Sequence, residues 1–161
     1  MMTVILTGSA LLILALLLTC VIGIANGPVG LVVLYEEDVQ ERAVALGYLT
    51  RKQLRRQLLL TCLALFLPQL ILIPLQVYLM GGAEDFTSAF LNIAAIYWIA
   101  GLFDRLFIDW YWVGRTKAWI IPGTEDLRPY IPPRVLLRKW IGTILVYPLM
   151  AAALAWLLML I

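Results

Sequence analysis

The basic residues of this chain occupy only two stretches, and both stretches lie between long apolar runs. All 12 Lys and Arg residues fall between residues 42 and 56 or between residues 105 and 139. The polar segment at residues 80–87 carries Glu84 and Asp85 and no base. Membrane proteins concentrate Lys and Arg in the loops that stay on the cytoplasmic side. The pattern therefore predicts a polytopic membrane protein with both basic segments in the cytoplasm.

The apolar runs define four candidate membrane spans. Hydrophobic residues make up 63% of the 161 residues and charged residues 14%, far from the composition of a soluble domain. A helix needs about 20 apolar residues to cross a bilayer, and we place the spans at about residues 9–34, 58–80, 87–107 and 140–161. The loops at residues 35–57 and 108–139 then lie in the cytoplasm, and both termini lie on the outer side.

The predicted fold is an all-α integral membrane protein: one four-transmembrane-helix bundle, residues 1–161, with short cytoplasmic interfacial helices. Asn26-Gly27-Pro28 should disturb the first apolar run near its cytoplasmic end. Thr50 and Gln53 match a capping box, so a helix should begin at Arg51 and continue into the second span. We expect the protein in a bacterial cytoplasmic membrane, in contact with lipids, as a homo-oligomer or beside a partner membrane subunit.

Pro68 and Pro74 lie inside the second span. Each removes one helical hydrogen bond, which should bend the helix and leave the carbonyls of Ala64 and Leu70 without a backbone donor. Polar residues on the second and third spans could line a water-filled path, or could bind neighbouring helices to one another. These residues are Gln69, Gln76 and Asn92.

Three ionisable residues, Asp104, Arg105 and Asp109, lie at the cytoplasmic end of the third span. Charged groups at membrane depth are costly and are typical of functional sites. Arg105 and Asp109 are four residues apart and can pair along one helix face. Asp104 should lie about 100° away, on a different face of the helix. The alternative is an ordinary helix end, at which Arg105 reaches the interface and the acids are solvated.

The following loop adds aromatic and basic residues to this candidate site. Trp112, Arg115 and Lys117 could hold a lipid head group, although an aromatic belt at the membrane interface has the same composition. Thr124 follows a Pro-Gly turn and could cap a short helix, and a loop that folds back would bring Thr124, Glu125 and Asp126 near the acids of the third span. The candidate ligand-binding residues are Asp104, Arg105, Asp109, Trp112, Arg115, Lys117 and Thr124.

Histidine is absent from the chain, which excludes His-ligated haem, His-bound zinc and His-based acid–base catalysis. The carboxylates of the third span and the loop would suit Mg²⁺ or Ca²⁺, but their spacing matches no specific metal motif. No cofactor is predicted. The net charge of +2 gives no sign of a nucleic-acid partner.

An Asp-Arg pair followed by a second Asp is similar to the Asp-Arg of lipoprotein signal peptidases, which are four-span bundles of similar length with two catalytic aspartates. The match covers only a few residues, and the Asn- and Gly-rich context of that family is missing. The predicted topology also places both acids on the wrong face for that chemistry. We therefore assign no family from the sequence.

Three functions remain open at this point. The first is a non-enzymatic binding or interaction protein, whose cytoplasmic face binds an anionic lipid head group, a small ligand or a partner protein. The second is an oligomeric channel or transporter for an ion or small solute, with Gln69, Gln76 and Asn92 facing a pore. The third is a membrane enzyme that acts on a lipid head group through Asp104 and Asp109.

Overall fold

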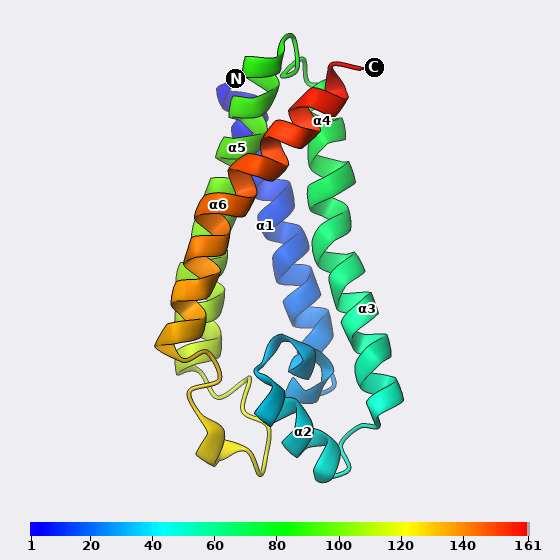
Figure 1. Cartoon of the computed structure of the whole chain (residues 1–161), viewed down its shortest axis with the longest axis vertical. Coiled ribbons are helices and arrows are strands. Elements are labelled where there is room, and N and C mark those ends of the chain that lie inside the picture. The colour runs from blue at the N-terminus through cyan, green and yellow to red at the C-terminus, as the bar shows by residue number, and fades with distance from the viewer. Residues whose placement is uncertain (161) are drawn as a thin grey trace.

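Four long helical segments dominate the computed structural model, which describes residues 1–160. They are long and apolar enough to cross a membrane, and no β-strand occurs among the described residues. The chain enters and leaves the bundle at one end, and α2 (Glu37–Ala45) lies at the opposite end (Figure 1). We call these the termini end and the α2 end. The predicted all-helical, four-helix architecture is confirmed.

The first apolar run folds into two helices. The first helix, α1, covers Met2–Ile24, and the 3-10 helix η1 covers Pro28–Leu34. Gly27 between them has a φ of +106°, and Pro28 has no N–H to extend the α-helix. A Cβ on Gly30 would overlap the carbonyl of Gly23, so η1 lies directly against α1. The α1 helix therefore begins before the predicted start of the span at residue 9, and it ends before the predicted end at residue 34.

The second long helix begins where the capping box predicts. In α3 (Arg51–Leu67) the hydroxyl of Thr50 accepts from the N–H of Gln53 at 3.3 Å. The side-chain oxygen of Gln53 accepts from the N–H of Thr50 at 2.7 Å. These bonds satisfy donors that a helix start otherwise leaves free.

Neither proline ends this helix. The π-helix η2 covers Pro68–Leu72, and α4 continues at Ile73–Leu79. Because π geometry pairs each residue with the fifth one before it, the pairing differs from that of the α-helix assumed in the prediction for Ala64 and Leu70. The side-chain amide of Gln69 donates to the carbonyl of Leu65 at 3.0 Å.

A tyrosine from another helix completes the π segment. Its last backbone bond runs from the N–H of Ile73 to the carbonyl of Pro68. The next bond in this register would need an N–H at Pro74, which has none. The carbonyl of Gln69 is then left without a donor in that register, and the hydroxyl of Tyr97 donates to it at 2.5 Å.

The third long helix continues further than predicted. It comprises α5 (Phe86–Phe103) and the π-helix η3 (Asp104–Val113), whereas the prediction ended the span near residue 107. Ile108 and Val113 are buried and pack into the apolar core, so this segment remains helical. At the start of α5 the carboxylate of Asp85 accepts from the N–H of residue 88, and this backbone hydrogen bond lowers the pKa of Asp85.

The fourth long helix, α6 (Pro133–Leu158), begins before the predicted start at 140. Proline fits the first turn of a helix because its missing N–H would be unpaired there in any case. α6 packs along α5, where a Cβ on Gly101 would meet the ring of Tyr147. It also contacts α4 toward the termini end, while α3 and α6 diverge toward the α2 end (Figure 1).

An apolar cluster closes the α2 end. We call it the cap, and it consists of η1, α2 and residues 114–132. The hydroxyl of Tyr35 donates to the carbonyl of Trp119 at 3.1 Å, and the hydroxyl of Tyr48 donates to the carbonyl of Pro122 at 3.1 Å. Burial raises the pKa of Tyr35 above its usual range. The buried residues of the cap include Val32, Val39, Trp119, Ile121 and Tyr130.

Replacing Tyr97 by Phe should lower the free energy of unfolding in detergent by about 1–3 kcal/mol, because the carbonyl of Gln69 would be left buried without that donor. In a Pro74→Ala background, residue 74 regains an N–H, and the same replacement should cost less. Chemical unfolding of the four proteins of this double-mutant cycle measures the difference. Equal losses in both backgrounds would show that the hydroxyl does not replace a missing backbone donor.

Candidate ligand-binding site

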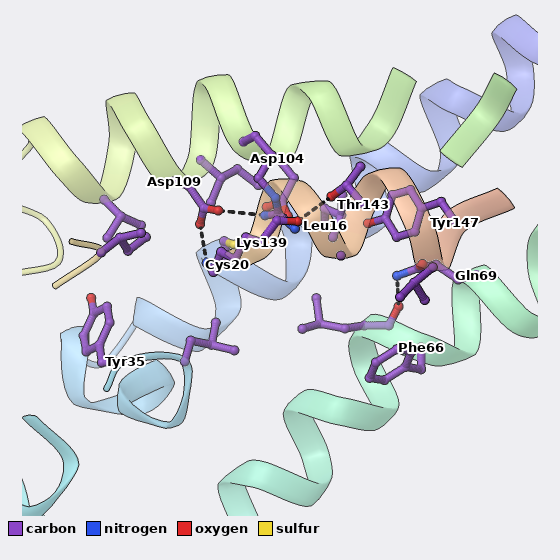
Figure 2. Close-up of a pocket in the computed structure, with 18 of the residues that line it drawn as sticks. Leu16, Cys20, Tyr35, Phe66, Gln69, Asp104, Asp109, Lys139, Thr143 and Tyr147 are labelled. Carbon is purple, nitrogen blue, oxygen red and sulfur yellow. Dashed lines mark hydrogen bonds and ion pairs between the residues drawn. The ribbon is translucent and has the colours of Figure 1, made fainter. Parts of the chain in front are cut away.

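A cavity of about 410 Å³ lies in the bundle between α1, α3, η3, α6 and the cap. Its volume falls within the range of about 300–1,000 Å³ that is typical of small-molecule sites. Most of its wall is apolar, with one charged region contributed by η3 and α6 (Figure 2). Apolar lining residues include Leu16, Phe66, Ile108, Val146 and Met150.

The charged region is a chain of four residues with alternating sign. Lys139 Nζ lies 2.8 Å from Asp109 Oδ1, and Asp109 Oδ2 lies 2.7 Å from Arg105 Nη1. The same Nη1 lies 2.5 Å from Asp104 Oδ2. The order is therefore Lys139, Asp109, Arg105 and Asp104, and the four formal charges cancel.

The π geometry of η3 explains why both acids meet one arginine. Residues five apart on an α-helix are rotated by about 140° from each other, because one turn takes 3.6 residues. A π-helix pairs residue i with residue i+5, which brings such residues closer to one face. Asp104 and Asp109 are five apart within η3, and Arg105 binds both. The predicted pairing of Arg105 with Asp109 is confirmed, whereas the prediction had placed Asp104 on a different face.

Burial distinguishes the middle of this chain from its ends. The side chains of Asp109 and Arg105 are 6% and 11% exposed. Those of Asp104 and Lys139 are 22% and 30% exposed. An ordinary helix end with solvated acids therefore does not describe this segment. Asp109 is buried, and its charge is balanced by cations from η3 and α6.

One stripe of α6 provides a gradient of polarity along the cavity. Lys139 lies nearest the cap, and Thr143 and Tyr147 follow at helical spacing (Figure 2). Met150 also lines the cavity and lies furthest along α6 toward the termini end. Gly142 belongs to the same stripe, and a Cβ placed on it would meet nothing within 4 Å. A glycine inside a helix costs about 1 kcal/mol relative to alanine. Packing does not require this glycine, and its missing side chain leaves room in the cavity.

Two buried N–H groups of cavity-lining residues have no hydrogen-bond acceptor within residues 1–160. They are Nε of Arg105 and the indole Nε1 of Trp119. Trp119 is only 1% exposed, so its N–H has no access to bulk solvent. Buried donors without partners are uncommon and costly. An acceptor oxygen from a bound molecule would relieve that cost if it reached them.

The loop residues predicted for the site lie outside the cavity. Trp112 packs edge-on against Trp119 with ring centroids 5.2 Å apart. The guanidinium of Arg115 lies 4.0 Å from the ring centroid of Trp110, and Lys117 is exposed. Of the predicted ligand-binding residues, the cavity brings together Asp104, Arg105 and Asp109.

Thr124 has a structural role within the cap. Its hydroxyl is fully buried, donates to the carbonyl of Ile121 at 2.8 Å and lies 2.7 Å from the hydroxyl of Tyr130. It makes no capping bond to the 3-10 helix η4 (Glu125–Leu127), contrary to the prediction. A buried hydroxyl needs partners, and here the preceding turn and Tyr130 supply them.

The predicted gathering of loop carboxylates near the third span does not occur. Asp126 pairs with Arg42 at 3.3 Å, and Glu125 accepts from the N–H of Gly123 at 2.8 Å. Within residues 1–160 no group of three His, Cys, Asp or Glu residues lies close enough to hold a metal ion. The suggested Mg²⁺ or Ca²⁺ site therefore has no support from this geometry.

The polar residues considered for a pore are buried within one chain. Gln76 donates to the carbonyl of Val4 at 3.2 Å and lies 3.1 Å from the hydroxyl of Thr7. Asn92 donates to the carbonyl of Gly82 at 2.9 Å. Gln69 lines the cavity near α6 (Figure 2). The contacts of Gln76 join α4 to α1, and the bond of Asn92 joins α5 to the preceding loop. Polar groups used inside one chain in this way count against the pore alternative.

Sequence reasoning missed the contribution of α6, namely Lys139, Thr143 and Tyr147. The fourth span was placed from about residue 140, which left Lys139 in a loop. Pro133 at the first helical position was the available signal, because a helix starting there places Lys139 more than one turn inside it.

Comparisons with protein-family models, with curated proteins and with solved structures found no match to this chain. The assignment of function therefore depends on the cavity and its residues.

Lys139 and its neighbour Arg138 provide a matched test of the charge chain. Lys139→Met should lower the free energy of unfolding by about 2 kcal/mol, less than the 3–5 kcal/mol of a fully buried pair because Lys139 is partly exposed. Arg138→Met should cost less than about 1 kcal/mol, since its 3.1 Å pair with Glu36 is exposed. Thermal and chemical unfolding in detergent would compare the two. Equal losses would contradict a structural role for the Lys139–Asp109 pair.

Proposed function

We propose that this chain is an integral membrane protein that binds an amphipathic lipid in the cavity, with the α2 end in the cytoplasm. The observation that carries the proposal is an apolar cavity with one charged region, formed by helices of membrane-spanning length. An apolar wall with a few convergent polar groups is the usual composition of a small-molecule site. The apolar wall suits a hydrocarbon chain, and the charged residues suit a polar head.

The orientation is supported by the distribution of charge between the two ends of the bundle. The 12 bases lie in α2, the start of α3, the end of the third helix, the cap and the start of α6. The loop at the termini end carries Glu84 and Asp85 and no base. Basic loops of this length stay in the cytoplasm, so both termini would lie outside.

The walls of the cavity favour access from the bilayer. The cap covers the α2 end, where Tyr35 and Trp119 line the cavity and are almost fully buried. Phe66 of α3 and Val146 of α6 also line the cavity, but they are 49% and 50% exposed. These two residues lie on the helices that diverge toward the α2 end (Figure 1). A lipid moving within the bilayer would reach the cavity between α3 and α6.

The gradient along α6 sets the direction of the bound molecule. Its charged head would lie beside Lys139 and Asp104, and its apolar part would extend along Val146 and Met150 toward the termini end. With the α2 end in the cytoplasm, this is the direction of a lipid in the inner leaflet. The lipid would not have to turn over to bind.

A membrane enzyme is the second candidate, and one observation favours it. Asp104 and Asp109 line the cavity and converge on a single nitrogen of Arg105. A general base needs a free carboxylate oxygen, and both oxygens of Asp109 are held, one by Arg105 and one by Lys139. Binding therefore explains the arrangement better than acid–base catalysis does.

Filling the space beside Gly142 should block binding without unfolding the protein. Gly142→Leu places a side chain in the cavity, and leucine is a better helix former than glycine. Native mass spectrometry, after incubation in detergent with phosphatidylethanolamine and phosphatidylglycerol, should show lipid adducts on the unchanged protein and few on the variant. Ala153→Leu is the control, because Ala153 is exposed on the same helix and does not line the cavity. Adducts that persist equally on Gly142→Leu would exclude this cavity as the binding site.

The proposed orientation can be tested by labelling single cysteines in cells, in a background in which Cys20 and Cys62 are replaced by Ala. Glu84→Cys should react with a membrane-impermeant maleimide added outside. Lys117→Cys should react only after the membrane is permeabilised, because it lies in the basic loop. External labelling at position 117 would reverse the orientation.

A further inference from the structure

We infer that the cavity selects a zwitterionic head group, one that carries a phosphate and an ammonium group, over a purely anionic one. The inference rests on the lipid-binding function proposed above and names the class of lipid. It follows from the order of charges in the chain of Lys139, Asp109, Arg105 and Asp104.

The chain of four charged residues ends in a cation, Lys139, on one side and in an anion, Asp104, on the other. Asp109 uses both carboxylate oxygens, one for Lys139 and one for Arg105. At one end, Lys139 has donated one of its three N–H groups to Asp109, and its side chain is 30% exposed. At the other end, Asp104 pairs with Arg105 through Oδ2, and its side chain is 22% exposed. The charges that remain accessible are one ammonium and one carboxylate.

A zwitterionic head group complements both ends at once. Its phosphate would pair with Lys139, and its ammonium would pair with Asp104, so that six charges of alternating sign would form a closed ring. The site would stay neutral, which matters because an unbalanced charge in an apolar cavity carries a large desolvation cost. An anionic head group would satisfy Lys139, leave Asp104 without a cation and add a net negative charge.

The two unpaired donors of the cavity also favour a head group that contains phosphate. Arg105 Nε and Trp119 Nε1 are buried N–H groups of residues that line the cavity. Neither group has an acceptor in the described part of the chain. Phosphate and ester oxygens are strong acceptors, and charge-assisted hydrogen bonds to them are stronger than neutral ones. An ammonium group can only donate, so it cannot satisfy either group. Its partner is the carboxylate of Asp104.

The test compares two lipids with identical acyl chains. Native mass spectrometry of the unchanged protein, with equal amounts of phosphatidylethanolamine and phosphatidylglycerol in detergent, should show about tenfold preference for phosphatidylethanolamine, the size expected of one additional partly buried ion pair. Because this comparison needs no variant, a folding defect cannot obscure it. Equal binding, or a preference for phosphatidylglycerol, would overturn the inference.

Two variants locate the preference within the site. Asp104→Asn should lower phosphatidylethanolamine binding about tenfold, because the ammonium loses its partner. It should raise phosphatidylglycerol binding, because the site without Asp104 carries one net positive charge that an anionic head group neutralises. Lys139→Arg keeps the charge and should keep the preference. A preference that survives Asp104→Asn would overturn the role of Asp104.

The same experiment separates this inference from the proposed function. If Gly142→Leu removes both lipids but the unchanged protein prefers phosphatidylglycerol, the cavity binds lipid and the zwitterionic selectivity is wrong. If neither lipid binds, or if Gly142→Leu changes neither, the proposed function itself fails.

Discussion

Asp109 joins two helices through a single buried carboxylate, and the shape of the α2 half of the bundle depends on it. Arg105 of η3 and Lys139 of α6 each bind one of its oxygens. Removing either cation would leave the two carboxylates of Asp104 and Asp109 with one cation between them, and so one uncompensated negative charge. The pairing holds α6 against η3, while α3 diverges from α6 on the other side. The cavity between them is therefore fixed by an ion pair on one wall and bordered by an apolar opening on the other.

Two π-helical segments contribute to this cavity, and both follow from the same constraint. In an apolar environment every backbone and side-chain polar group needs a partner inside the protein. In η2, the π register would require a donor from Pro74, which has no N–H, and the hydroxyl of Tyr97 donates to the carbonyl of Gln69 in its place. In η3, the shift brings two acids to one arginine. Departures from α geometry are frequent at functional sites, and here both of them lie beside the same space.

The number of long helices and the capping box at Thr50 could be predicted from the sequence, because apolar length and a Thr-x-x-Gln spacing are local properties. The pairing of Arg105 with Asp109 could also be predicted from a spacing of four. The position of Asp104 could not, since the prediction assumed 3.6 residues per turn and the segment is a π-helix. Lys139 was missed because its helix begins at Pro133, before the apolar run does. The burial of Thr124 in the cap depends on contacts between distant segments, which no local pattern records.

The cap is assembled from two parts of the chain that are far apart in sequence. One part, η1 and α2, lies between the first and second long helices, and the other, residues 114–132, follows the third. In a chain synthesised from its N-terminus, Val32 and Val39 would emerge well before Trp119 and Ile121 can cover them. Under the membrane topology proposed above, the first part would lie uncovered at the membrane surface until two further helices had been inserted. Biogenesis of this protein would then include an interval in which an apolar surface is exposed and open to chaperones or to incorrect pairing.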